Sequence, residues 1–89
     1  MTEWTGAKLA EHIKNYHKTT NPLILARIYN FEINNAIFTH TPGSYVVHDD
    51  GRKEILVDFS LPPHLVMFHV GRQFALYLLE HPDQIMGAD

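Results

Sequence analysis

The sequence predicts a two-layer α+β domain of order αββββα, in which two helices cover one face of an antiparallel four-stranded sheet. Three observations predict this fold class. Apolar residues recur at helical spacing near both ends of the chain, the middle is rich in β-branched and aromatic residues, and turn dipeptides divide that middle region. The length of 89 residues, without internal repeats or linkers, predicts a single domain over residues 1–89.

The first helix is expected over Thr5–Lys18. Leu9 and Ile13 lie on its apolar stripe, while charged and amide side chains occupy the opposite side. Thr5 is a suitable N-cap, because its hydroxyl can accept a hydrogen bond from a free amide of the first turn. The run Thr19–Pro22 is expected to end the helix, because the residue before a proline is disfavoured in the helical conformation.

Four strands are expected in the middle of the chain, over Leu23–Ile33, Ala36–His40, Ser44–Asp49 and Arg52–Phe59. They are separated by three dipeptides that commonly form tight turns, namely Asn34-Asn35, Pro42-Gly43 and Asp50-Gly51. If each dipeptide is a two-residue turn, every strand pairs antiparallel with the next. The expected cross-strand pairs are Ile33 with Ala36, Thr41 with Ser44, and Asp49 with Arg52.

This register gives the sheet two different faces. An aliphatic face, with Ile55 and Val57 among its members, is expected to hold the helices. The opposite face is expected to be aromatic and to face water, and its candidate interface residues are Tyr29, Phe31, Phe38, His40, Tyr45, Val47 and Leu56. A register error of a single residue would interchange the two faces, because the side-chain period of a strand is two.

The second helix is expected over Ser60–Glu80, with Ser60 as its N-cap and two prolines tolerated in its first turn. Its apolar residues cover an arc wider than the roughly 100° that a surface helix needs. We therefore expect this helix to be buried on more than one side. The residues of the arc that are expected to contact a second copy of the chain are Met67, Val70, Gly71, Phe74 and Leu78.

No pattern of residues predicts catalysis, a metal site or a cofactor site. The chain has no cysteine, and its five glycines are too far apart for a phosphate-binding loop. The histidine pairs His12/His17 and His64/His69 are five residues apart, whereas two metal ligands on one helix face need a spacing of three or four. We therefore expect no catalytic, metal-binding or cofactor-binding residues, and no enzyme activity.

The charge balance and the apolar stretches limit the partners and the location. Seven Lys and Arg residues against ten Asp and Glu residues give a formal net charge of −3, which disfavours nucleic acid as a partner. No apolar stretch is long enough to span a bilayer and the first residues lack the features of a signal peptide, so no membrane association is expected. The absence of cysteine predicts a reducing, cytoplasmic setting.

The aromatic sheet face and the wide apolar arc together exceed what one layer pair of this size can cover. The sequence therefore predicts a small, non-enzymatic protein-binding module. It would act as a homodimer, or as an adaptor or inhibitor against a larger protein. In size and composition it is comparable with small phage-encoded inhibitors, which would act in the host cytoplasm. The alternative is a nucleic-acid-binding domain that stacks bases on the aromatic sheet face.

Overall fold

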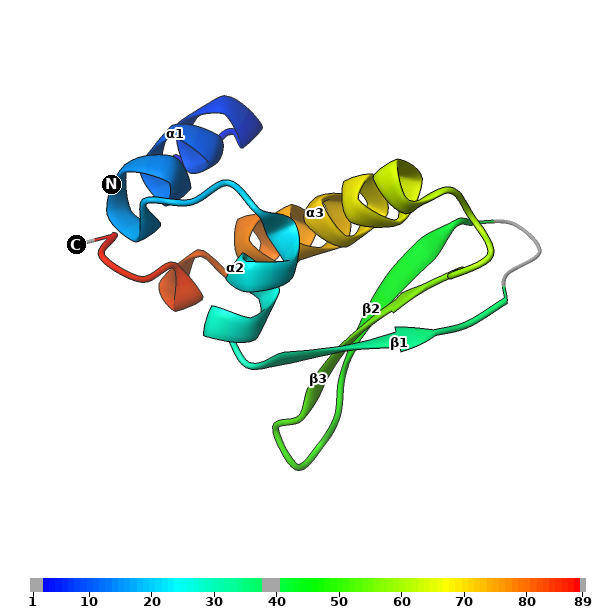
Figure 1. The fold of residues 1–89 in the computed structure, drawn as a ribbon. Helices are drawn as coiled ribbons and strands as arrows, with labels where there is room; N and C mark the ends of the chain where they lie inside the picture. Colours follow the sequence, from blue (N-terminus) through cyan, green and yellow to red (C-terminus); the bar gives the residue numbers. More distant parts are fainter. Residues whose placement is uncertain (1–2, 38–40, 89) are drawn as a thin grey trace.

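The computed structural model describes residues 3–37 and 41–88 of the chain (Figure 1). Within these residues the fold is α+β. The elements in chain order are α1 (Gly6–His17), α2 (Pro22–Ile28), β1 (Phe31–Asn35), β2 (Gly43–Val47), β3 (Lys53–Val57), α3 (Pro63–Glu80) and a short 3-10 helix η1 (Pro82–Gln84). The strands form a mixed sheet of order β1-β3-β2, with β1 parallel and β2 antiparallel to β3. The prediction of four antiparallel strands and two helices is therefore wrong.

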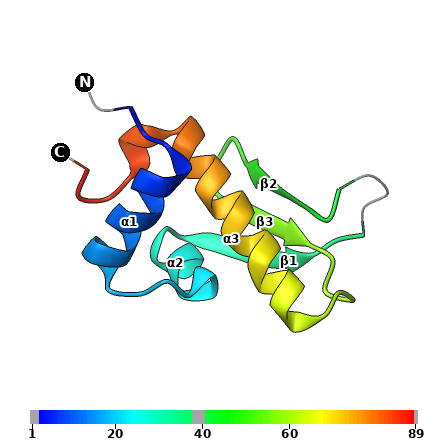
Figure 2. The same ribbon diagram turned by 90° about the horizontal axis from the view of Figure 1, so that it is seen from above.

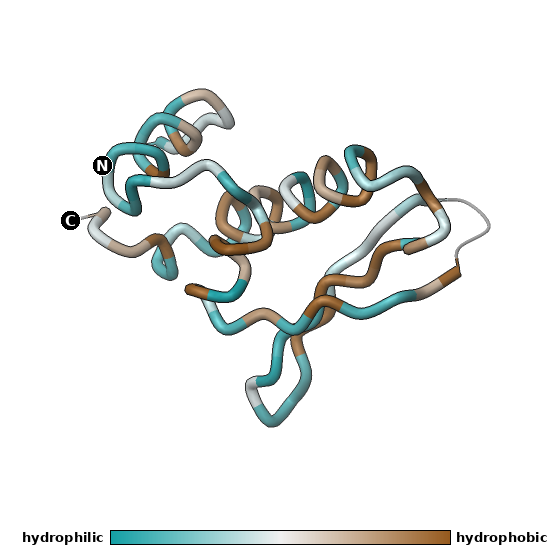
Figure 3. Tube along the Cα trace, viewed as in Figure 1, coloured by the Kyte–Doolittle hydropathy of each residue, from teal (hydrophilic) through white to brown (hydrophobic). Residues whose placement is uncertain are grey.

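The helices form a layer on one side of the sheet. Helix α3 crosses the sheet above β2 and β3, and α2 packs between α3 and β1 (Figures 1 and 2). Helix α1 packs against α3 and lies farther from the sheet. The hairpin tip between β2 and β3 is hydrophilic, whereas apolar residues predominate along α3 and in the central part of the sheet (Figure 3). Within the described residues, no helix is both long enough and apolar enough to cross a bilayer.

Helix α1 confirms the first predicted helix. It begins after Thr5, whose Oγ1 accepts a hydrogen bond of 3.2 Å from the amide of Lys8. It ends at Lys18, which adopts a left-handed conformation with φ of 59°. Leu9 and Ile13 are buried, as the apolar stripe predicts.

Helix α2 replaces most of the strand predicted over Leu23–Ile33. Asn21 caps the helix, because its Oδ1 accepts a hydrogen bond of 3.0 Å from the amide of Leu23, and Pro22 occupies the first turn. Asn30, with φ of 64°, ends the helical segment and redirects the chain into β1. The buried side chains of the segment recur at helical spacing, at Leu25, Ala26 and Tyr29. The Asn21-Pro22 dipeptide thus separates two helices, whereas it was expected only to end the first.

Strand β1 also differs from the prediction. Asn34 and Asn35 belong to the strand and do not form the predicted turn. Ile33 pairs with Ile55 of β3, so the predicted pairing of Ile33 with Ala36 does not occur. Ala36 and Ile37 lie outside any strand, and the remainder of the predicted strand Ala36–His40 falls outside the described residues. A parallel pair needs a crossover connection, which here contains the whole of β2.

The turn predicted at Pro42-Gly43 is replaced by the start of β2. Gly43 is the first residue of that strand and pairs with Val57. Ser44 pairs with Leu56, so the predicted pairing of Thr41 with Ser44 does not occur.

The β2–β3 hairpin confirms the turn at Asp50-Gly51 but corrects its length. The amide of His48 donates a hydrogen bond of 2.8 Å to the carbonyl oxygen of Arg52, so three residues form the turn and Asp49 does not face Arg52. This shift of one residue moves Tyr45 to the same face as Ile55. That face is the one covered by α3, because the Tyr45 hydroxyl donates a hydrogen bond of 2.5 Å to Oε1 of Glu80.

The aromatic residues consequently form part of the core. The Phe31 and Tyr77 rings meet edge to face with centroids 5.0 Å apart, and Tyr29 meets Phe74 in the same way at 5.1 Å. Buried residues from helices, strands and the C-terminal segment form one cluster, consisting of Leu9, Ile13, Leu25, Ala26, Tyr29, Phe31, Ile55, Val57, Val70, Phe74, Tyr77, Leu78 and Ile85.

Helix α3 starts at Pro63, two residues later than an N-cap at Ser60 predicts. Ser60 is not its N-cap, because the Ser60 hydroxyl donates to Oδ1 of Asp58 and the capping position is held by Pro62 without a side-chain hydrogen bond. The expectation that this helix is buried on more than one side is confirmed, since it contacts α1, α2, β2 and β3.

Candidate functional site

The residues of the predicted aromatic face do not lie together on a surface. Tyr29 and Phe31 are only 2% and 7% exposed. Tyr45 is half-buried on the side of the sheet that α3 covers, whereas Leu56 lies on the open side. Val47 is exposed at the end of β2. The remaining two, Phe38 and His40, lie outside the described residues.

The residues predicted to form a dimer helix divide into two groups. Val70, Phe74 and Leu78 are buried within the chain itself. Met67 and Gly71 are partly exposed and line a groove between α1, α3 and the start of α2. This α1–α3 groove is the candidate functional site of the molecule.

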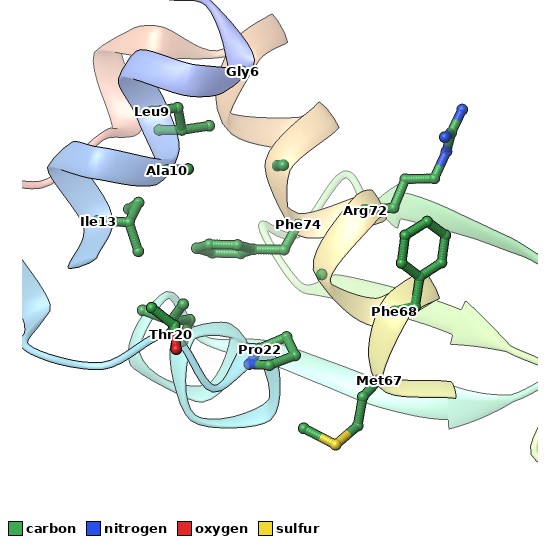
Figure 4. A pocket seen from close by; sticks show the side chains of 13 residues that line it. Gly6, Leu9, Ala10, Ile13, Thr20, Pro22, Met67, Phe68, Arg72 and Phe74 are labelled. Carbon is green, nitrogen blue, oxygen red and sulfur yellow. The ribbon is translucent and has the colours of Figure 1, made fainter. Parts of the chain in front are cut away.

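The groove has a volume of about 520 Å³ and an almost entirely apolar lining (Figure 4). Leu9 and Ile13 point into it from α1 and face Phe74 of α3. The complete lining is Gly6, Leu9, Ala10, Ile13, Thr20, Pro22, Leu25, Met67, Phe68, Gly71, Arg72, Phe74 and Ala75. Thr20 and Arg72 supply its polar side-chain atoms.

Small residues keep the groove open. Gly6 and Ala10 are one helical turn apart on α1, and Gly71 and Ala75 are one turn apart on α3. A Cβ atom on Gly6 would meet nothing within 4 Å, and one on Gly71 would meet Pro22 at 3.4 Å. Another chain can therefore approach the α1 backbone closely at Gly6, whereas at Gly71 the close neighbour is Pro22 of the chain itself.

The edge of the groove carries an exposed aromatic ring and a cation. Phe68 is 58% exposed, and Arg72 is exposed and forms no ion pair within residues 3–37 and 41–88. The wider surroundings are also basic, because residues 3–28 and 63–80 carry five Lys or Arg side chains against three Asp or Glu side chains. The groove is therefore suited to an apolar ligand surface that carries negative charge at its border.

Hydrogen bonds hold the C-terminal segment against α1 and against Tyr29 at the end of α2. His12 donates from Nε2 to the carbonyl oxygen of Met86 at 2.8 Å, and the amide of Met86 donates to the Tyr29 hydroxyl at 3.1 Å. The same hydroxyl lies 2.8 Å from Nε2 of His17. Burial, together with the nearby His12, lowers the pKa of His17, and burial raises the pKa of Tyr29. A neutral His17 that accepts from Tyr29 satisfies all three groups, so we infer a structural role.

Charged residues at and beside the hairpin tip form a network that is exposed around Arg52 and half-buried at His48 and Glu54. Arg52 lies 3.3 Å from Asp50 and 3.7 Å from Glu32, while His48 lies 3.3 Å from Glu54. Hydrogen bonding from the backbone of Arg52 lowers the pKa of Asp50. Within the part of the chain that the structure describes, no group of three or more histidine or carboxylate side chains could hold a metal ion.

The α3 side of the groove includes Met67, Gly71 and Phe74, which the sequence predicts to contact a second copy of the chain, whereas no prediction pointed to the α1 side. The pairs Gly6/Ala10 and Gly71/Ala75, each spaced by four residues, were a usable signal, since a small-residue stripe on two helices indicates close approach. Comparison of the chain with protein-family models, curated proteins and solved structures finds no match in any of the three.

Proposed function

We propose that this chain is a non-enzymatic protein-binding module whose α1–α3 groove receives an amphipathic helix of a partner protein. The observation that carries this proposal is an open apolar groove of about 520 Å³ with an exposed ring at its edge, beside an arginine that pairs with no carboxylate among the described residues. Such a combination of an apolar centre and a charged rim is typical of protein interfaces.

A helical ligand fits the lining better than an extended one. An extended segment would bring its amide and carbonyl groups against a surface that offers almost no polar partners, at a cost of about 1–3 kcal/mol for each unsatisfied group. A helix forms the hydrogen bonds of its backbone internally and presents only side chains to the groove. The small residues Gly6 and Ala10 on α1 also favour it, because they let a ligand helix pack closely against α1.

The charge at the groove favours an acidic partner. Arg72 is the charged residue of the lining, and a carboxylate beside the apolar face of the ligand helix would pair with it. The expected ligand therefore has aliphatic or aromatic residues at positions i, i+3 or i+4, and i+7, with Asp or Glu on the adjoining face.

The nucleic-acid alternative finds less support. Base stacking needs exposed rings on a sheet surface, and Tyr29 and Phe31 are buried. The cytoplasmic location stays a prediction from the absence of cysteine.

Selection of displayed random peptides of about 16 residues, roughly four helical turns, tests the proposal. Immobilised wild-type protein should enrich apolar, acidic peptides with helical periodicity. Arg72→Glu should shift the enriched sequences from Asp and Glu toward Lys and Arg at the border position, because the charge preference is reversed.

A matched pair of variants tests the location of binding. Ala10→Phe places a ring inside the groove and should reduce the affinity of an enriched peptide at least tenfold, whereas Ala7→Phe, on an exposed position of α1 outside the lining, should leave it unchanged. Enriched peptides that bind Ala10→Phe as tightly as wild type would contradict the proposal. Absence of any enriched helical peptide would contradict it as well.

A further inference from the structure

The outer edge of β2 presents unpaired backbone groups. Backbone hydrogen bonds of an antiparallel strand alternate in direction, and His48 donates toward β3. Ser44 and Val46 therefore also point their amides and carbonyls toward β3, while Tyr45 and Val47 point theirs away from the sheet. Within residues 3–37 and 41–88, the Tyr45 carbonyl oxygen lies 3.5 Å from the Ser44 hydroxyl, and the other three groups have no hydrogen-bond partner.

The backbone groups of Gly43 also point away from the sheet, but a side chain of the same chain already bonds to them. The Thr41 hydroxyl donates to the carbonyl oxygen of Gly43 at 2.9 Å and lies 3.5 Å from its amide. The outer edge thus offers the amides and carbonyls of Tyr45 and Val47, and the Tyr45 carbonyl oxygen, which has a long contact with the Ser44 hydroxyl, keeps a second acceptor position.

This edge also lacks the features that usually keep strands apart. Natural edge strands are protected by charged residues, prolines or bulges, whereas Gly43–Val47 contains no charged residue and no proline, and pairs with β3 without a bulge. The other edge strand, β1, carries Glu32.

We propose that two copies of this chain associate through their β2 edges, antiparallel and across a two-fold axis, to form a continuous six-stranded sheet. Tyr45 of each copy pairs with Val47 of the other through two backbone hydrogen bonds, which makes four in total. The two Val46 residues then face each other on the axis as a non-hydrogen-bonded pair.

The positions of the free groups select this register. Pairing Tyr45 with Tyr45 would need the Gly43 groups that Thr41 already occupies. Pairing Val47 with Val47 would need Asp49, which lies in the hairpin turn. Only the register centred on Val46 uses the amides and carbonyls of Tyr45 and Val47 and leaves the Gly43 groups bonded to Thr41.

The charges and side chains around the axis favour a second copy as the occupant. Ser44 faces His48 of the other copy, so no like charges are directly opposed. The nearest acidic side chain, Glu54, stands one strand away from Val46. Two Glu54 side chains are thus separated by three strand spacings, about 14 Å, which exceeds the screening length of about 8 Å at physiological salt. Val46 is 36% exposed, and β-branched pairs across strands are stabilising.

Light scattering after size exclusion, over a concentration series, is the first test. The wild-type protein should shift from the monomer mass to the dimer mass. Val46→Lys places two ammonium groups on the axis and should raise the dissociation constant at least a hundredfold, while Val46→Thr should leave it within about threefold. Circular dichroism of Val46→Lys checks that the monomer is folded, as expected for a side chain on the open face.

Amide hydrogen exchange followed by NMR distinguishes this dimer from any other. At a concentration where nine-tenths of the chains are dimeric, the amides of Tyr45 and Val47 should exchange about tenfold more slowly than in dilute solution. The Val46 amide, which faces β3, is the internal control and should not change. A protein that stays monomeric, or a dimer that survives Val46→Lys with unchanged exchange at Tyr45 and Val47, would overturn the proposal. The α1–α3 groove shares no residue with this edge, so its test is independent.

Discussion

Replacing Tyr29 by Phe tests how the C-terminal segment is held. The change removes one hydroxyl, which accepts from the amide of Met86 at 3.1 Å and lies 2.8 Å from Nε2 of His17. Each intramolecular hydrogen bond contributes about 1 kcal/mol, and the exposed position of Met86 lets water reach its amide. The expected loss is therefore about 1–2 kcal/mol of unfolding free energy. For a domain of this size that corresponds to a fall in Tm of roughly 5–15 °C.

Urea unfolding monitored by circular dichroism measures this loss. Tyr16→Phe is the matched control, because Tyr16 is 53% exposed and its hydroxyl has no hydrogen-bond partner among the described residues, so its effect should stay within about 0.5 kcal/mol. Adding His17→Gln to Tyr29→Phe should cost less than the sum of the two single changes, since both remove the same contact. Equal losses for Tyr29→Phe and Tyr16→Phe would refute the reasoning.

Three further predictions concern the titrating groups and the core. Burial lowers the pKa of His17, so the unfolded chain takes up a proton first as the pH falls; stability should decrease below about pH 6.5 in urea titrations, and less in His17→Gln. Burial and the bond to Glu80 raise the pKa of Tyr45 to about 12, and burial also raises the pKa of Tyr29 and Tyr77, so stability should fall above about pH 10, and ultraviolet titration should show fewer tyrosines ionising near pH 10 in wild type than in unfolded protein. Leu78→Ala, at a fully buried site, should cost about 2–5 kcal/mol by the same unfolding assay, and a loss below about 1 kcal/mol would contradict the packing described.

The parts of the fold that sequence predicted correctly depend on local signals. Thr5 caps the helix that it precedes, and Asp50-Gly51 lies in the turn where it was expected. Both effects act over a few residues and depend little on the rest of the chain.

The errors arose where two local interpretations compete or where distant residues decide. Asn21-Pro22 can end one helix or begin the next, and here the side chain of Asn21 caps the second. The segment after it is rich in β-branched residues, but burial of Leu25, Ala26 and Tyr29 outweighs the weak strand preference. The parallel pairing of Phe31–Asn35 with Lys53–Val57 joins residues 22 positions apart, and no local pattern specifies it.

The candidate site was accessible to sequence only in part. The wide apolar arc of the second helix correctly indicated more than one packing partner, yet it did not reveal which residues are covered within the chain. Phe74 and Gly71 both line the groove, but Phe74 is buried in the core while Gly71 stays partly exposed beside Pro22. That distinction depends on the placement of α1 beside α3, which the sequence pattern does not contain.

The two proposed surfaces together make a bivalent assembly. Helix α1 and strand β2 lie on opposite sides of α3, so a dimer formed through β2 leaves both grooves open (Figure 2). Two linked copies of a groove-binding peptide should then bind the wild-type dimer roughly a hundredfold more tightly than one copy, when the linker spans the two grooves. Val46→Lys should abolish this gain and leave the affinity for the single peptide unchanged. Isothermal titration of both peptides against both proteins measures the difference, and a loss of single-peptide affinity in Val46→Lys would show that the groove and the edge are not independent.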